Sequence, residues 1–450
     1  MVNVITPETL EDRMEQVIRE LIELSKGVGV DTSDIESILF DARQERMKEG
    51  INLIASENRM SPKAKLMYWL ATLAGLDGRY AEGHPGKRYY PGTKASDLLE
   101  PIATKELADL LGAKYVDVRP ISGNNANMAV FLRLLEAGDT VMAYTIHKGG
   151  HISHADVGSL GRRLKVRGKN LKDQLIPIPV TADGYHMDVE ETKKLIERHK
   201  PKLIVVGKSL FLFPESVSEI ADVCNQSGTI IYYDAAHVQG LIAGGQFQHP
   251  LKEGAHLAGA STHKTFPGPQ GGILYSNSPI ETDYILAVDR GVMPGTTSSH
   301  HLHRIAPLIV TIREFRGHPE YADQTVKNAR ALAESLARYG LEPDAKEYGY
   351  TMSHQVALNV RRITGENGKT VEGWLENNGI YANSNALPID TSVFDTSGIR
   401  MGTPEMTRRG MMEEQMDRIA WLMKRVILDR VNVKQEAKDL AMKFPAMQYW

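Results

Sequence analysis

Residues 229–237 read TIIYYDAAH, a short apolar run that ends in a carboxylate and an imidazole. Comparable runs recur at 139–144 (DTVMAY), 201–207 (PKLIVVG) and 271–277 (GGILYSN), and helical stretches such as ASDLLEPIATKELADLLG (95–112) alternate with them. Short apolar runs separated by helices are typical of βαβ units and predict a mostly parallel sheet covered on both faces. The centre of the chain is therefore predicted to have an α/β fold.

The pattern changes toward both ends of the chain. Residues 1–55 contain the amphipathic stretch TPETLEDRMEQVIRELIELS and are predicted to form an N-terminal helical arm. Residues 321–450 begin with the helical pattern YADQTVKNARALAESLARYG, continue with the strand-like HQVALNV and end in a long helix. This order predicts a smaller α+β domain, which leaves residues 56–320 as the large domain.

Composition excludes several classes of protein. The 450 residues are 42% hydrophobic and carry a formal net charge of −3, so the chain lacks the basic field expected of a nucleic-acid or anionic-lipid binder. No apolar run approaches the ~20 residues that span a bilayer, and the acidic N-terminus lacks the features of a signal peptide. A single cysteine, Cys224, excludes internal disulfides and cysteine-rich zinc sites. A cytoplasmic protein is expected.

Polar side chains follow the predicted strands. In parallel sheets, ligands bind beyond the carboxyl ends of the strands, so these residues are candidates for a site. The candidates are Ser209 after KLIVVG, Asp234 and His237 in TIIYYDAAH, Ser261, His263 and Lys264 in ASTHK, and His151 after DTVMAY. We expect them to share one rim of the sheet.

A phosphate cradle is predicted at SGNNAN, where Ser122, Gly123 and Asn124 lead into a helix beginning near Asn125. Free backbone N–H groups at a helix start favour an anion. A cradle of this kind, a carboxylate and a lysine amine are the groups needed to hold pyridoxal phosphate. The amine forms a Schiff base with the aldehyde, and the carboxylate keeps the ring nitrogen protonated.

Each of these groups has a simpler explanation when taken alone. A lone lysine is usually a surface residue, and Asp234 is as well suited to cap a helix. Ser, Gly and Asn are common in turns, and His151 can be a loop histidine bonded within its loop. The order of the three features along the chain favours the cofactor site.

The chain also resembles the serine hydroxymethyltransferase family, most closely its archaeal branch, from about residue 45 to residue 430. The matching segments are LIASENRMSP (53–62), GRYAEGHPGKRYYPGTK (78–94), SGNNAN (122–127), GGHISH (149–154), YDAAHVQGLIAGG (233–245), THKTFPGPQGG (262–272) and SGIRMGTPEMTRRG (397–410). The resemblance implies a pyridoxal-phosphate-dependent transferase of fold type I. It also implies a homodimer whose active sites are built from both subunits.

The resemblance implies roles for individual residues. Lys264 matches the lysine that is joined to the cofactor, Asp234 the partner of the pyridinium nitrogen, and His151 the imidazole stacked on the ring. Further cofactor contacts are implied for Ser122, Gly123, Asn124, Ser209, His237, Ser261, His263, Tyr80 and, from the other subunit, Gly295.

The implied reaction is transfer of the hydroxymethyl carbon of serine to a reduced pterin, tetrahydrofolate or tetrahydromethanopterin, which leaves glycine. Arg400 matches the guanidinium that binds the substrate carboxylate, assisted by Ser56, because a planar guanidinium can bind a carboxylate through two hydrogen bonds. The set expected to face amino acid and pterin is Tyr80, Glu82, Tyr89, Tyr90 and Asn385.

Glu82 is the candidate for proton transfer between the substrate hydroxyl and the pterin, and Tyr90 is placed beside it among the catalytic residues. The alternative for Glu82 is a structural salt bridge to Lys87 or Arg88. Four positions depart from the commonest family pattern, and they leave the choice of pterin open. They are Asn124, Ser261, Gln270 in place of an arginine, and His84 in place of an aromatic residue.

Two other readings of the catalytic set stay open. A pterin-independent β-hydroxy-amino-acid (threonine) aldolase or a threonine transaldolase would use the same carbanion, and certain transaldolases resemble this chain at THKT and MTRRGM. A non-enzymatic cofactor-holding protein is disfavoured by the full catalytic set. His300, His301 and His303 form a cluster that we expect to lie in a loop near the dimer interface, with no metal.

Overall fold

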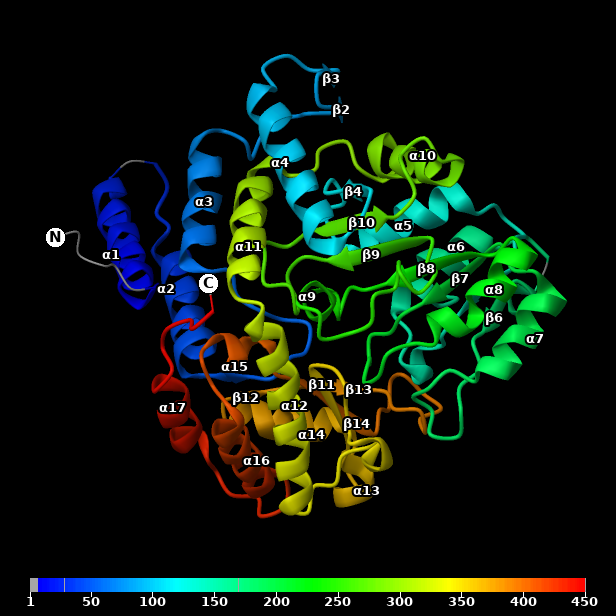
Figure 1. Ribbon diagram of the computed structural model, residues 1–450. Coiled ribbons are helices and arrows are strands. Elements are labelled where there is room, and N and C mark those ends of the chain that lie inside the picture. The colour runs from blue at the N-terminus through cyan, green and yellow to red at the C-terminus, as the bar shows by residue number, and fades with distance from the viewer. Residues whose placement is uncertain (1–6, 28, 169, 450) are drawn as a thin grey trace.

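The computed structural model describes residues 7–27, 29–168 and 170–449. These residues form a central seven-stranded sheet with strand order β4-β10-β9-β8-β7-β5-β6 (Figure 1). The strands are β4 (Tyr115–Asp117), β5 (Val141–Ala143), β6 (Leu175–Pro177), β7 (Leu203–Val206), β8 (Ile230–Asp234), β9 (Leu257–Ser261) and β10 (Gly272–Ser276). Strand β10 runs antiparallel to both of its neighbours, and the other pairs are parallel. The predicted mostly parallel sheet is confirmed, with GGILYSN as its antiparallel strand.

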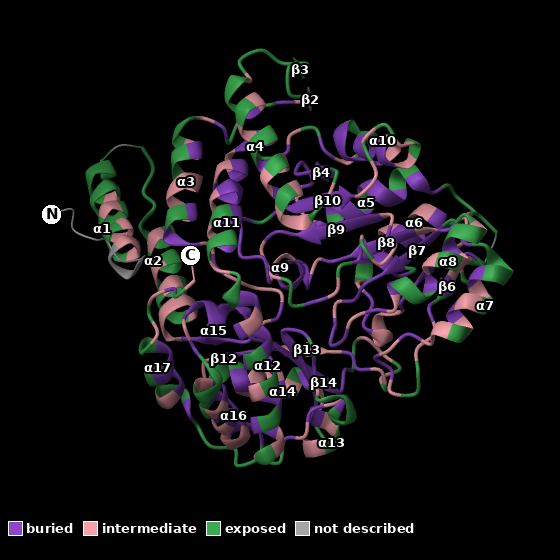
Figure 2. Ribbon diagram, in the orientation of Figure 1, coloured by how far each residue is buried: buried purple, intermediate pink, exposed green. Residues whose placement is uncertain are grey.

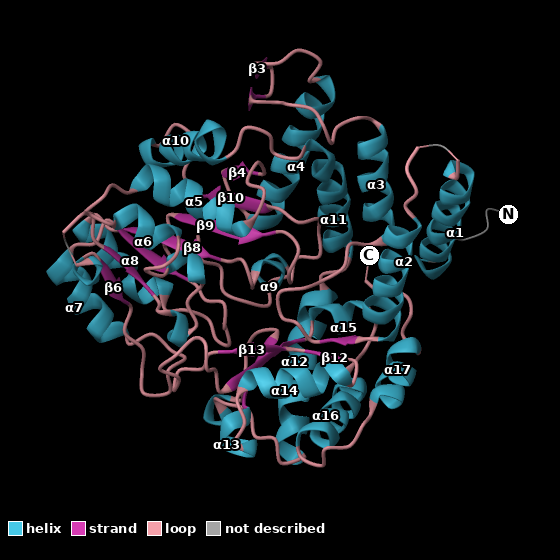
Figure 3. Cartoon of the chain, turned by 180° about the vertical axis from the view of Figure 1, so that it is seen from behind, coloured by secondary structure: helices cyan, strands magenta, loops and turns pink. Residues whose placement is uncertain are grey.

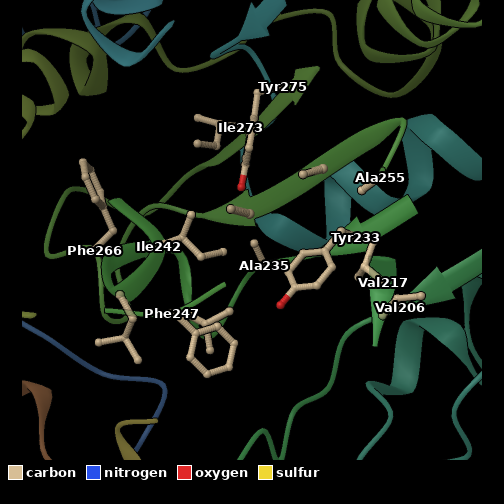
Figure 4. Packing of buried hydrophobic residues seen from close by; sticks show 14 of the residues in the cluster. Val206, Val217, Tyr233, Ala235, Ile242, Phe247, Ala255, Phe266, Ile273 and Tyr275 are labelled. Carbon is tan, nitrogen blue, oxygen red and sulfur yellow. The ribbon is translucent and has the colours of Figure 1, made fainter. Parts of the chain in front are cut away.

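Successive residues of the central strands enter different cores. Tyr233 and Val206 belong to one cluster, and Figure 4 shows them among Ala235, Phe247 and other buried side chains. Tyr232, the neighbour of Tyr233 in β8, belongs to a second cluster. Because successive side chains of a strand point to opposite faces, a continuous apolar run such as IIYY requires cover on both faces of the sheet.

Helices on both faces supply that cover. The cluster around Tyr233 includes residues of α4 (Lys94–Leu111), α7 (Val189–His199), α8 (Val217–Ser227), α9 (Gln239–Ala243) and α11 (Ile305–Gly317). The cluster around Tyr232 includes residues of α5 (Gly123–Leu134), α6 (Ser159–Leu164) and α10 (Asp283–Arg290). The α/β architecture therefore follows from the apolar runs that identify the strands.

The C-terminal part is a smaller α+β unit, as predicted. Its three strands are antiparallel in the order β11-β14-β13. The strands are β11 (Gln355–Asn359), β13 (Asn383–Asn385) and β14 (Gly398–Gly402), and the helices are α12 (Glu320–Arg338), α13 (Val360–Thr364), α14 (Gly368–Asn377), α15 (Pro404–Arg408), α16 (Glu413–Ile427) and α17 (Lys434–Met442). Figure 3 shows the helices packed around this sheet, below the central one.

The N-terminal arm lies at one side of the molecule (Figure 1). It comprises α1 (Pro7–Ser25), α2 (Ser33–Ala42), the π-helical turn η1 (Arg43–Glu49) and β1 (Ile51–Asn52), and α3 (Pro62–Leu73) follows it. Strand β1 pairs in parallel with β12 (Ile380–Tyr381), so the end of the arm is joined to the C-terminal unit. The boundaries after residues 55 and 320 remain our proposal.

Short turns and one hairpin complete the elements. The hairpin β2 (Gly83–His84) and β3 (Lys87–Arg88) projects beyond α4 at the edge of the molecule (Figure 1). The short helical turns are η2 (Ile146–Lys148), η3 (Ile152–His154), η4 (Leu171–Asp173), η5 (Gly291–Thr296), η6 (Leu302–Arg304) and η7 (Lys346–Tyr348). Within the described residues, no helix combines the length and apolar character needed to cross a membrane.

Candidate active site

The ends of the central strands bring the predicted polar residues together. Asp234 ends β8 and pairs in register with Gly259 of β9, and Lys264 follows that strand by three residues. Arg400 enters from β14 of the C-terminal sheet. The charges of Asp234, Lys264 and Arg400 all act on the pKa of His151, so the four side chains occupy one site.

Asp234 is a buried carboxylate held by three donors. Asn127 Nδ2 donates to its Oδ2 at 2.8 Å, His154 Nε2 lies 3.0 Å from the same oxygen, and the N–H of Ala236 donates to Oδ1 at 2.9 Å. Burial alone would raise the pKa of Asp234, but the hydrogen bond and charge of His154, the charge of His151 and the N–H of Ala236 together lower it well below its usual value. Asp234 is therefore ionised at neutral pH, as a partner for a protonated pyridine nitrogen must be.

The orientation of the Asn127 amide is fixed by a second buried hydrogen bond, from Tyr232. Tyr232 donates its hydroxyl hydrogen to Asn127 Oδ1 at 2.6 Å, which leaves Nδ2 as the atom that faces Asp234. Tyr232 and Asn127 are both buried, so this relay does not exchange its partners for water. It fixes the Asp234 carboxylate before any ligand binds.

Lys264 carries an amine whose pKa burial lowers to about 8, with Arg400 adding to the shift and Asp234 opposing it. The main-chain carbonyl of Lys264 accepts a hydrogen bond from Asn58 Nδ2 at 2.7 Å, and Asn58 Nδ2 also donates to Tyr321. The backbone that carries the amine is thus anchored. A substantial fraction of the amine is unprotonated near neutral pH, which is the nucleophilic form.

His151 immediately precedes the turn η3, and a hydrogen bond determines which of its ring nitrogens carries the proton. The backbone N–H of Ser153 donates to His151 Nδ1 at 3.2 Å, so the neutral ring carries its proton on Nε2. Burial lowers the pKa of His151 to about 4, and the charge of Asp234 only partly offsets this effect. The ring is therefore neutral at physiological pH and suits stacking on an aromatic system.

The start of α5 fits a phosphate group. Ser122 caps the helix by accepting a hydrogen bond from the N–H of Asn125 at 3.0 Å, which leaves the N–H groups of Gly123 and Asn124 at the open end. A Cβ on Gly123 would lie 2.5 Å from Ser261 Oγ, so the close approach of these two loops requires glycine. The buried Nδ1 of His263, beside Lys264, has no hydrogen-bond partner within the described chain. The N–H groups at the start of α5 suit an acceptor-rich ligand such as a phosphate.

Arg400 is a buried cation without a carboxylate partner among the described residues. Its Nε and Nη2 donate to Asn383 Oδ1 at 3.2 and 3.1 Å, and its Nη1 donates to the carbonyl of Ser209 at 2.9 Å. Burial lowers the pKa of Arg400 to about 10, so it still carries its charge. A buried guanidinium that faces only neutral oxygens fits the carboxylate of an incoming ligand.

Ser209 and His237 join this group through Gln355. The amide of Gln355 contacts both the Ser209 carbonyl and His237 Nδ1. Ser56 lies beside His263 and Gln270 in the wall of a cavity of about 640 Å³. Asn385 ends β13, two residues from the Asn383 that holds Arg400. These predicted residues therefore lie on or next to the site.

The hairpin residues are not brought to Lys264 within one chain. Tyr80 and Tyr90 pack against each other with ring centroids 5.4 Å apart, and with Glu82 and Tyr89 they belong to the exposed segment around β2 and β3 (Figure 1). Among the described residues, Glu82 forms no salt bridge with Lys87 or Arg88, and Arg88 pairs with Asp97 and Glu100 instead.

Gly295 lies on the outer surface, beside the start of α5. It belongs to η5, which packs on α5, and a Cβ on it would lie 3.2 Å from the side chain of Leu132. Gly295, Asn124 and Leu132 line an open cavity of about 820 Å³ on this outer surface.

Sequence reasoning missed four residues that hold the site. Asn127 and His154 fall inside the quoted motifs SGNNAN and GGHISH, where helical spacing after Gly123 and a second imidazole were the available signals. Asn58 stands in LIASENRMSP and Gln355 in HQVALNV, and nothing in the sequence links either to a partner more than a hundred residues away. Contacts of this kind depend on tertiary structure.

The histidine cluster belongs to the support of the hairpin. His300 Nε2 lies 2.7 Å from Glu100, which also pairs with Arg88, and His303 Nε2 lies 2.8 Å from the hydroxyl of Tyr68. Within the part of the chain that the structure describes, no group of three or more His, Cys, Asp or Glu residues is arranged to hold a metal ion.

Comparison with known proteins gives consistent matches. A sequence profile described as serine hydroxymethyltransferase matches residues 30–423. The serine hydroxymethyltransferase of Pyrobaculum arsenaticum is 46% identical over 90% of this chain and 91% of its own, and that of Pyrococcus abyssi is 44% identical over 87% and 89%. The crystal structure of L-threonine transaldolase from Pseudomonas fluorescens superposes with a TM-score of 0.82 and 25% identity, over 96% of this chain and 94% of that one.

Proposed function

The chain belongs to the serine hydroxymethyltransferase family, and from this premise we propose how its residues carry out the reaction. The family resemblance and the α/β fold of pyridoxal-phosphate-dependent enzymes of fold type I are confirmed. The function is pyridoxal-phosphate-dependent transfer of the hydroxymethyl carbon of serine to a reduced pterin, part of one-carbon metabolism.

One observation carries the assignment of the site. A buried lysine amine lies within the influence of an ionised buried carboxylate, Asp234, and of a buried guanidinium without a carboxylate partner among the described residues, Arg400, and burial lowers the pKa of the amine to about 8. Lys264 would hold the cofactor covalently, Asp234 would bind its ring nitrogen, and His151 would stack on its ring. Ser122, Gly123, Asn124, Ser261 and His263 would surround its phosphate, and Ser209 and His237 would lie near its phenolic oxygen.

When bound, the cofactor supplies an electron sink that stabilises negative charge on the substrate α-carbon. The chain supplies binding and orientation. Arg400 binds the substrate carboxylate with help from Ser56, and the contacts of Arg400 with Asn383 and Ser209 fix the plane of the guanidinium. Holding the carboxylate fixes which bond of the α-carbon faces the ring, so that the hydroxymethyl carbon is the group released.

We propose that the remaining groups come from a second subunit. Glu82, Tyr80 and Tyr90, with Gly295, lie on the outer surface of one chain, so a homodimer is needed to place them in a site. Glu82 has no ion-pair partner among the described residues, so its carboxylate is free to move a proton between the substrate hydroxyl and the pterin, and Asn385 would contact the pterin.

Exposed apolar side chains support the dimer. Figure 2 shows exposed residues along α1, α3 and the hairpin at one side of the molecule. The exposed large apolar residues include Trp69, Leu70 and Leu73 on α3, Leu98 and Ile102 on α4, and Tyr80, Tyr89 and Tyr90 around the hairpin, and α5 exposes Met128 and Leu132 elsewhere on the molecule. Large exposed apolar side chains gathered on neighbouring elements are typical of a protein interface. We also propose that the enzyme is cytoplasmic and acts on a free amino acid.

A threonine transaldolase is the second candidate function, because the superposition with such an enzyme covers nearly the whole chain. The test is formation of glycine from serine with tetrahydrofolate, with tetrahydromethanopterin and with no pterin, alongside release of acetaldehyde from threonine. Glycine formation that depends on one of the two pterins supports the hydroxymethyltransferase. Activity indifferent to both pterins, with acetaldehyde as the main product from threonine, supports the transaldolase or an aldolase.

A further inference from the structure

Gln355 is a fully buried amide on β11 that has no role in the reaction described above. Two backbone groups fix its orientation. The N–H of Phe211 donates to Gln355 Oε1 at 2.7 Å, and Gln355 Nε2 donates to the carbonyl oxygen of Ser209 at 3.0 Å. A backbone N–H can only donate and a carbonyl can only accept, so the amide cannot be flipped without losing both hydrogen bonds.

This fixed amide determines the state of His237. The second hydrogen of Gln355 Nε2 points to His237 Nδ1 at 2.9 Å, so Nδ1 accepts a hydrogen bond and carries no proton. The other imidazole near the amide does not compete, because His354 Nε2 lies 3.2 Å from the carbonyl of Ala55 and donates to it. His237 is 3% exposed, so water does not substitute for these partners.

We propose that Gln355 is a positioning residue that holds His237 in the neutral tautomer with its proton on Nε2. In that form the ring can donate a hydrogen bond from Nε2 into the site and cannot accept one there. His237 follows Asp234 by three residues, and the nearby charges of Lys264 and Arg400 disfavour the doubly protonated ring. The tautomer is therefore set by a residue of the C-terminal unit, through the Nδ1 edge of His237.

The same amide links His237 to the substrate-binding arginine. The carbonyl oxygen of Ser209 accepts hydrogen bonds from Gln355 Nε2 and from Arg400 Nη1 at 2.9 Å. Gln355 and Arg400 lie on paired strands, where Ala357 is the partner of Arg400 in register. Loss of the amide would therefore change the proton position on His237 directly, and would affect the position of Arg400 only indirectly, through the shared carbonyl of Ser209.

The catalytic importance of the His237 tautomer rests on the proposed function, but the tautomer itself can be measured without any enzyme activity. Selective ¹⁵N labelling of histidine distinguishes the protonated from the bare ring nitrogen by chemical shift, and a His237→Asn variant assigns the signals. Wild type is expected to show a bare Nδ1 and a protonated Nε2 in the purified full chain, with or without cofactor. A protonated Nδ1 in wild type would overturn the proposal whatever the enzyme catalyses.

Two variants test the cause. Gln355→Glu keeps an oxygen that accepts the hydrogen bond from the Phe211 N–H. It replaces the Nε2 donor that faces His237 by a second acceptor oxygen, so the ring proton is expected to move to Nδ1. Gln355→Met keeps the volume and removes the donor, so a mixture of tautomers is expected. If the glutamate variant does not fold, the methionine variant decides the matter, and an unchanged tautomer in a folded variant contradicts the proposal. Gln174→Glu places the same change at another buried glutamine, outside the site, and is expected to leave His237 unaltered.

Kinetics then separate a positioning role from a structural one. With serine and the preferred pterin, Gln355→Glu is expected to lower kcat by about 10- to 100-fold, because the donor at Nε2 is lost, with a smaller rise in KM. A moved proton with an unchanged kcat would overturn a positioning role of Gln355 in catalysis and would leave only its control of the His237 tautomer. If wild type has no serine activity but the tautomers shift as expected, the proposed function fails and the control of His237 by Gln355 stands.

Discussion

Arg400 Nη1 donates to the carbonyl oxygen of Ser209 at 2.9 Å, which ties the C-terminal sheet to the loop after β7 of the central sheet. The other guanidinium nitrogens share a single oxygen of Asn383. All three contacts are to neutral oxygens, so the charge of Arg400 is oriented but not neutralised. This arrangement holds a guanidinium in place and leaves its charge for a substrate carboxylate.

Arg400→Lys is expected to raise the KM for serine by about 10- to 100-fold with a smaller effect on kcat. Lysine keeps the charge but cannot reproduce the planar donor set, and hydrogen bonds to charged groups are worth about 1.5–3 kcal/mol. Steady-state kinetics with serine check this, and Arg330→Lys, on α12 at the other side of the C-terminal unit, serves as the control. An unchanged KM for serine would remove Arg400 from substrate binding.

The fold could be predicted largely from the sequence, because a strand covered on both faces has to be apolar throughout. LIVV and IIYYD show this pattern, and both are central parallel strands. The antiparallel direction of GGILYSN could not be predicted, since an apolar run of five residues looks the same in either direction. Helix α17 was not predicted. Only Ala437, Leu440 and Ala441 of this helix are buried, so its apolar pattern in the sequence is weak.

The site was predictable where a motif supplied the chemistry and not where the contact was distant. Asp234, Lys264 and Arg400 stand out because a carboxylate, an amine and a guanidinium are unusual at the ends of buried strands. Asn127 and Gln355 are neutral amides, and their importance comes from partners on other elements that no local pattern reveals. Asn124 is expected to contact the cofactor, and its side chain lies exposed and toward Met128. Only its backbone N–H stands at the open helix end.

Asn127→Leu is expected to lower the free energy of unfolding, because it replaces the amide between Tyr232 and Asp234 by a branched apolar group that cannot form hydrogen bonds. The Tyr232 hydroxyl and the Asp234 carboxylate each lose a buried partner, at about 1–3 kcal/mol per group. Urea denaturation checks this. Asn225→Leu, on the exposed face of α8, is the control and is expected to stay within about 0.5 kcal/mol of wild type. Equal stability of the two variants would mean that water replaces the amide of Asn127.

The amine of Lys264 is expected to titrate near pH 8 in the cofactor-free enzyme, because burial and Arg400 lower its pKa to about 8. The rate of covalent cofactor uptake, trapped by borohydride and located by peptide mapping, should rise with pH around that value as the amine loses its proton. Lys264→Ala should lose the visible absorption of the bound cofactor altogether. The exposed Lys194 is the comparison. If the pH dependence of its labelling matched that of Lys264, the lowered pKa of Lys264 would be contradicted.

Acid is expected to destabilise the protein through His354. Burial lowers the pKa of this ring to about 3, from an ordinary value near 6.5, so the folded state stays neutral while the unfolded state takes up a proton below pH 6.5. A lowered histidine pKa therefore costs stability as pH falls, about 2 kcal/mol between pH 8 and pH 5. Urea denaturation at both pH values should show a smaller loss in His354→Gln than in wild type. The exposed His199→Gln should behave as wild type, and equal losses in all three proteins would contradict the assignment.

Mixing two inactive variants tests whether Glu82 acts in the site of its partner. Lys264→Ala lacks the cofactor lysine and Glu82→Gln lacks the proton carrier, so each homodimer should be inactive. If the hairpin of one chain serves the site of the other, a heterodimer has one site that lacks both groups and one that is intact. Random exchange of subunits makes half of the dimers mixed, so about a quarter of the wild-type activity should return. If Glu82 acted in the site of its own chain, every site would lack one group and mixing would restore nothing. Exchange is verified by mass spectrometry of differently tagged chains, and a mixture of Lys264→Ala with Asp234→Asn, two residues of the same site, should stay inactive.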